Sequence, residues 1–131
     1  MAKTWFNRHN DALARIGEIR NADVLNAPPV RIAILDSGIE LSQEQRDDYD
    51  LEREHKIVYK SWIDKENMEW KDKDGHGTHL TILTHRIAPR AAIYVARVYE
   101  TDPGMETNSR TNIAEVNQSL CSQDMHAANA S

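Results

Sequence analysis

The chain has 131 residues, of which 40% are hydrophobic, and its formal net charge is −5. This length and composition indicate one globular domain with a modest core. The acidic balance argues against electrostatic binding to nucleic acid or to anionic membranes, and no apolar segment is long enough for a signal peptide or a membrane span. The single cysteine, Cys121, excludes an internal disulfide and favours a reducing compartment. We therefore expect an intracellular, cytoplasmic protein.

The N-terminal region, residues 1–29, is expected to be a helical extension. Residues 10–20 have the apolar spacing of a short helix, with Asn10 or Asp11 as its N-cap. The Pro-Pro pair at the end of this region stops any earlier helix and imposes an extended backbone.

Three segments have the composition of β-strands: residues 30–35, 56–60 and 92–98. The first is nearly all apolar, which predicts a strand buried on both faces of a parallel sheet. Helical spacing over residues 78–87 separates the second strand from the third, and a last helix is predicted over residues 112–120. The order strand, helix, strand implies parallel strands with right-handed crossovers, so the fold class is α/β.

The remaining segments are polar. Residues 40–55 are dense in charge and indicate a solvated loop or a short helix, and residues 101–110 indicate a loop. Residues 121–131 lack periodicity and are expected to be an irregular tail. Residues 30–120 therefore form the main domain.

Asp36 comes at the carboxyl end of the first predicted strand, where the side chains of an open parallel sheet face a crevice. An aspartate there suits catalysis, metal binding or phosphoryl transfer. It also suits the simpler role of capping the turn that follows, because Asp often does so. The residue alone does not separate these roles.

The segment DGHGTH offers two histidines for a metal site, His76 and His79, with Asp72 or Asp74 as oxygen ligands. The glycines around His76 place it in a turn, so a rigid pair of ligands is not assured. A calcium loop that starts at Asp72 would need a bidentate glutamate at its twelfth position, where the chain has Leu83. The calcium loop is therefore excluded, and no metal ligands are assigned.

A general base is the better interpretation of His76. The glycine on each side allows another backbone or a substrate to approach the imidazole, and the pKa of histidine lies nearest to neutrality. Asp74 is expected to cap the turn that presents His76. His79 is expected to be a structural helix residue, and His85 a surface residue.

Three segments together resemble the motifs of the subtilisin-like serine proteases, the subtilases. VRIAILDSGI resembles the segment that holds the family's catalytic aspartate, here Asp36. DGHGTH resembles the segment with its histidine, here His76, which comes 40 residues later. IAPRAAIYVARV, residues 87–98, is similar to the segment that leads into the family's next core strand. The resemblance covers residues 30–100 and implies a three-layer subtilisin-like fold with a mainly parallel sheet, incomplete in this chain.

The resemblance also implies an activity, that of a serine-type endopeptidase that acts on polypeptide substrates without cofactor or metal. Asp36 would be the aspartate of an Asp-His-Ser triad, accepting a hydrogen bond from imidazole Nδ1 and stabilising the imidazolium. His76 would be the general base.

The chain departs from the family pattern where the nucleophile is expected. The family's serine lies in a Gly-Thr-Ser-Met-Ala context, which this chain lacks. The last glycine, Gly104, precedes all four later serines, which are Ser109, Ser119, Ser122 and Ser131. We therefore expect a partial peptidase domain that is inactive as given and pairs with a missing C-terminal half. A non-catalytic pseudoprotease or interaction module is the alternative.

A sheet of three strands would expose an edge, expected at residues 93–98, and an apolar face. Exposed strands of this kind self-associate. The chain is therefore expected to be aggregation-prone.

Overall fold

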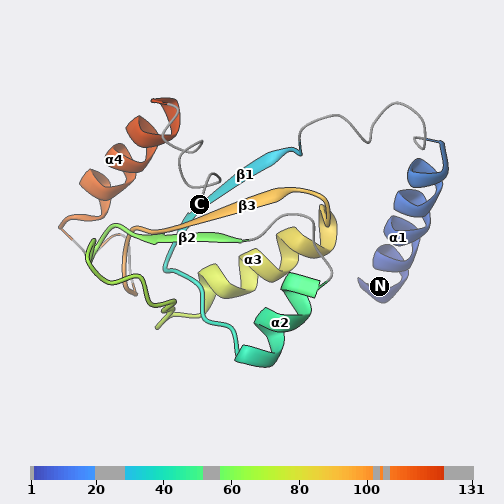
Figure 1. Cartoon of the computed structure of the whole chain (residues 1–131), viewed down its shortest axis with the longest axis horizontal. Coiled ribbons are helices and arrows are strands. Elements are labelled where there is room, and N and C mark those ends of the chain that lie inside the picture. The colour runs from blue at the N-terminus through green and yellow to red at the C-terminus, as the bar shows by residue number, and fades with distance from the viewer. Residues whose placement is uncertain (1, 20–28, 52–56, 102–103, 105–106, 123–131) are drawn as a thin grey trace.

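The structure is a computed structural model that describes residues 2–19, 29–51, 57–101, 104 and 107–122. These residues form a mixed α/β arrangement of helices around one sheet (Figure 1). In chain order the elements are α1 (Ala2–Ile19), β1 (Arg31–Asp36), α2 (Gln43–Leu51), β2 (Val58–Ser61), α3 (His76–Ile87), β3 (Ala92–Arg97) and α4 (Ser109–Cys121).

The three strands form one parallel sheet in the order β1-β3-β2, which confirms the predicted parallel pairing. β3 pairs with β1 from Arg31–Ala92 to Asp36–Arg97. The expectation that residues 93–98 lie at an edge is wrong, because β3 is the central strand. Its apolar residues suit this place, since residues 93–98, including Arg97, are all buried.

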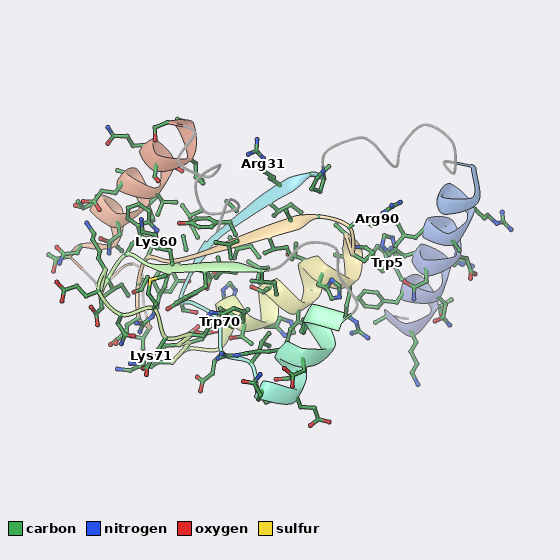
Figure 2. All side chains as sticks on the ribbon, viewed as in Figure 1. Trp5, Arg31, Lys60, Trp70, Lys71 and Arg90 are labelled. Atoms are coloured by element: carbon green, nitrogen blue, oxygen red, sulfur yellow. The ribbon has the colours of Figure 1, made fainter. Side chains whose placement is uncertain are left out.

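β1 is an edge of the described sheet, and the expectation of a strand buried on both faces holds only near its carboxyl end, where Ile34 and Leu35 pack into the clusters on opposite faces. Arg31 and Ala33 are exposed, Ile32 is partly buried against the core, and full burial begins at Ile34. Figure 2 shows Arg31 projecting away from the sheet. The buried end of β1 is therefore the end that carries Asp36.

Helices lie on both faces of the sheet (Figure 1). On one face α2 and α3 cover a cluster that includes Ile34, Ile93 and Val95. On the other face Val116 of α4 packs against Val98 and the rest of a second cluster near the carboxyl ends of the strands. Burial of each such aliphatic side chain contributes about 1.5–3 kcal/mol to folding. The second face, expected to be bare, is covered in part.

The helices start earlier than the sequence pattern predicted. α1 begins at Ala2, so Asn10 and Asp11 lie inside the helix and do not cap it. Its first turns contain Trp5 stacked on His9, with ring centroids 5.1 Å apart. Likewise α4 begins within the predicted loop at residues 101–110 and ends at Cys121, while residues 123–131 of the expected tail lie outside the described residues.

Candidate active site

Asp36 is the last residue of β1, and the sheet fixes its backbone. In the register of the parallel strands Asp36 lies opposite Arg97 of β3, and its carbonyl oxygen accepts a hydrogen bond from Val98 N at 2.9 Å. The residue is 5% exposed, so its carboxylate is held inside the protein where hydrogen bonds must replace water.

His76 is the first residue of α3. Its Nδ1 lies 2.9 Å from both carboxylate oxygens of Asp36. Because an ionised carboxylate only accepts hydrogen bonds, Nδ1 carries a proton and donates it to Asp36. The predicted pairing of these two side chains is thus observed, while their catalytic roles remain predictions.

The imidazole of His76 is open to solvent on its other side, with 60% of the side chain exposed. The hydrogen bond to Asp36 and the charge of that carboxylate raise the pKa of His76 above its ordinary value. No described residue forms a hydrogen bond with Nε2. Nε2 can therefore meet an incoming group from outside the described part of the chain.

Two glycines bring the turn after β1 against the start of α3. A Cβ on Gly77 would overlap the carbonyl oxygen of Gly38, so the backbones touch at this point. Gly38 itself has φ +125°, a conformation that other residues rarely adopt, and a Cβ there would overlap the carbonyl oxygen of Lys71. This close approach sets His76 beside Asp36.

The turn that presents His76 is capped by Asp72, and the expectation that Asp74 caps it is wrong. The Asp72 carboxylate accepts hydrogen bonds from Gly75 N at 2.8 Å and from Thr78 N at 2.7 Å, while Asp74 is exposed. Asp72 is the cap because its carboxylate lies within hydrogen-bond distance of N–H groups at the start of α3. These groups lack the partners that the N–H groups of later turns have.

Ser37 links this cap to Asp36. Its Oγ lies 2.7 Å from Asp72 Oδ1 and 3.1 Å from Asp36 Oδ1, and it accepts a hydrogen bond from Gly77 N at 3.1 Å. Burial alone would raise the pKa of Asp72, but the hydrogen bonds from Thr78, Ser37 and Gly75 outweigh burial and lower it. Asp72 therefore stays ionised and keeps accepting.

Tyr99 completes the surroundings of Asp36. Its hydroxyl donates to Asp36 Oδ1 at 3.0 Å, and its ring is buried. Burial and the hydrogen bond to Asp36 raise the pKa of Tyr99 well above its ordinary value, so the phenol remains a donor. Sequence reasoning missed Tyr99, which lies 63 positions from Asp36, and the linking role of Ser37, because its contact with Asp72 spans 35 positions.

The other candidate side chains do not join this site. His79 is exposed on α3, and His85, expected at the surface, is half-buried with its ring 4.8 Å from that of Tyr49. Among the described residues no cluster of three potential metal ligands was found. Of the late serines, Ser109 is buried at the start of α4, and Ser131 lies outside the described residues.

Comparison of the chain with protein-family models, with curated proteins and with solved structures found no match. Within the described residues, none of the helices has the length and apolar character needed to cross a membrane.

Proposed function

We propose that the chain is the N-terminal part of a subtilisin-like serine endopeptidase domain, in which Asp36 and His76 are two members of an Asp-His-Ser triad. The observation that carries the proposal is the pair itself: His76 Nδ1 lies 2.9 Å from the buried Asp36 carboxylate while the imidazole is 60% exposed. An imidazole oriented by a carboxylate and open at its second nitrogen is the arrangement that a general base needs.

The chemistry follows from the two nitrogens. Because Asp36 holds the proton on Nδ1, the lone pair of His76 is on Nε2. Nε2 would take the proton of a serine hydroxyl as its oxygen attacks the carbonyl carbon of a peptide bond, giving a tetrahedral intermediate and an imidazolium. Asp36 would stabilise that imidazolium, and His76 would then give the proton to the leaving amine as the C–N bond breaks.

The architecture is compatible with this assignment. The strands are parallel, helices lie on both faces, and Asp36 stands at the carboxyl end of its strand, where open α/β sheets place functional groups. The helix that follows β2 begins at His76, which puts the imidazole at the same end of the sheet. A three-layer subtilisin-like fold is the proposal that accounts for these placements together.

The nucleophile has to come from outside the described residues. Ser37 is the serine beside the pair, but its hydroxyl lies at 2.7 Å from Asp72 and contacts neither nitrogen of His76. This observation also favours a second candidate, a non-catalytic pseudoprotease or interaction module that keeps the aspartate and histidine without a serine. The two candidates differ in whether a serine ever reaches Nε2.

The test is to sequence the reading frame that encodes these residues in both directions and to express it over its whole extent. If the protein is an endopeptidase, a fluorophosphonate should label one of its serines, and His76→Ala should abolish the labelling. His79→Ala is the matched control, because His79 is an exposed histidine of the same helix and should leave the labelling intact. A folded protein that is not labelled, or is labelled without His76, would favour the non-catalytic candidate.

A further inference from the structure

Asp36 has a side-chain neighbour that the Asp-His-Ser scheme does not use. Tyr99 follows the end of β3 by two residues, and its ring is packed into the cluster beneath α4. Its hydroxyl reaches back to Asp36 Oδ1 at 3.0 Å. A buried phenol aimed at the carboxylate that orients His76 is placed to affect His76 through that carboxylate.

The donors around Asp36 show why Tyr99 matters. Oδ1 lies 2.8 Å from Ser37 N and 3.1 Å from Ser37 Oγ. The Ser37 hydroxyl has one proton, and Asp72 Oδ1 is the nearer acceptor at 2.7 Å, so that proton goes to Asp72. Among the described residues, Tyr99 is therefore the hydroxyl donor that Asp36 does not share with another carboxylate.

We propose that Tyr99 is a positioning residue for His76: its hydroxyl holds the Asp36 carboxylate in place and takes up part of its negative charge, which limits how strongly Asp36 favours the imidazolium. Hydrogen bonds to a carboxylate stabilise its charged form, so each donor leaves less of that charge for the others. The inference rests on the proposed function for its catalytic meaning. Its test measures the protonation of His76 and not proteolysis. The role of Tyr99 and the endopeptidase function can therefore be disproved independently.

Other charged groups face the pair and stay constant in the test. Asp72 and Asp74 precede His76 and add negative charge near it. Arg97, next to Asp36 in the sheet, donates to the Ser37 carbonyl oxygen and pairs with Glu100 at 3.2 Å. None of these charged residues is substituted in Tyr99→Phe, which leaves the charge of the protein unchanged.

The experiment measures the rate at which diethylpyrocarbonate modifies each histidine as a function of pH, at micromolar protein and with mass-spectrometric readout. The reagent acylates neutral imidazole, so the midpoint of the rate profile reports protonation of that histidine. In Tyr99→Phe the midpoint of His76 should move upward, while that of His79 in the same sample should not. Tyr94→Phe is the matched control, because it also removes a buried hydroxyl. That hydroxyl accepts a hydrogen bond from Trp62 Nε1 at 3.2 Å and forms none with Asp36.

A second variant keeps both the aromatic ring and the hydroxyl of residue 99. 3-Fluorotyrosine at position 99 preserves the ring and makes the hydroxyl a stronger donor, so the midpoint of His76 should move downward. Opposite shifts in the two variants support the proposal. An unchanged or lowered midpoint in Tyr99→Phe would overturn it. If Tyr99→Phe is unfolded by circular dichroism, the fluorotyrosine protein decides, and an unchanged or raised midpoint there would overturn it.

Discussion

The hydroxyl of Ser37 lies 2.7 Å from Asp72 Oδ1, although the two residues are 35 positions apart in the sequence. This contact joins the end of β1 to the turn that starts α3. The same Asp72 carboxylate accepts from Gly75 N and Thr78 N. The position of His76 against Asp36 therefore depends on a buried aspartate that forms no bond with either.

Replacing Asp72 tests this dependence. Asp72→Ala should lower the free energy of unfolding by about 1–3 kcal/mol, because the N–H groups of Gly75 and Thr78 and the Ser37 hydroxyl lose their acceptor. Asp74→Ala, two residues away and exposed, should change it by less than about 0.5 kcal/mol. Urea denaturation measures both. Equal losses in the two variants would contradict the assignment of Asp72 as the cap.

The lowered pKa of Asp72 adds a pH signature to the same pair of variants. Its stabilising effect is present above the ordinary value of 3.8 and is lost as pH falls through the lower folded-state value. The wild type and Asp74→Ala should therefore lose stability in that acid range by an amount that Asp72→Ala does not show.

The contact between Gly38 and Gly77 predicts that alanine substitutions at Gly77 and at Gly75, two residues before it, differ in their effect on stability. Gly77→Ala should destabilise the fold by more than about 3 kcal/mol, because its Cβ would overlap backbone atoms that cannot move aside. Gly75→Ala should cost only about 1–2 kcal/mol, since its φ is +83° but the space around it is open. Thermal melts of the two variants rank them, and a more stable Gly77→Ala would show that the backbones are not in contact.

Part of this arrangement was predictable from the sequence, and the limits have physical causes. Asp36 and His76 were found because each lies in a short motif at the end of an element. The contacts of Ser37 with Asp72 and of Tyr99 with Asp36 join segments 35 and 63 positions apart in the sequence, which no local pattern encodes. The cap at Asp72 is local, but its spacing was interpreted only as that of a possible metal ligand. The central place of β3 was missed because periodicity predicts strands but not their order, although its continuous burial is typical of a central strand.

The isolated 131-residue chain should not react as a serine hydrolase. Among the described residues no serine hydroxyl contacts His76, and a histidine and aspartate without a nucleophile give little turnover. Neither peptide hydrolysis nor fluorophosphonate labelling is expected. Labelling of a known serine protease by the same fluorophosphonate is the positive control. Stoichiometric labelling would mean that one of the chain's own serines reaches Nε2.

The exposed half of β1 should promote self-association, since no described strand pairs with its outer side. Ala33→Lys places a charge on this exposed edge position and should lower the association measured by sedimentation velocity. Ala114→Lys, at an exposed position of α4, makes the same change elsewhere and should have no such effect. Equal effects of the two lysines would point to net charge and not to the strand edge.

Asp36 raises the pKa of His76 through their hydrogen bond and through its charge, and the protonation midpoint of His76 in Asp36→Asn tests this acid-base pairing most directly. Asparagine can still accept from Nδ1 but has no charge, so the midpoint of diethylpyrocarbonate modification at His76 should fall below that of the wild type. In the wild type the raised pKa means that the pair stabilises the fold below pH 6.5, the ordinary value, and that this contribution is lost as pH rises through the raised one. An unchanged or higher midpoint in Asp36→Asn would show that the two side chains are neighbours without being an acid-base pair.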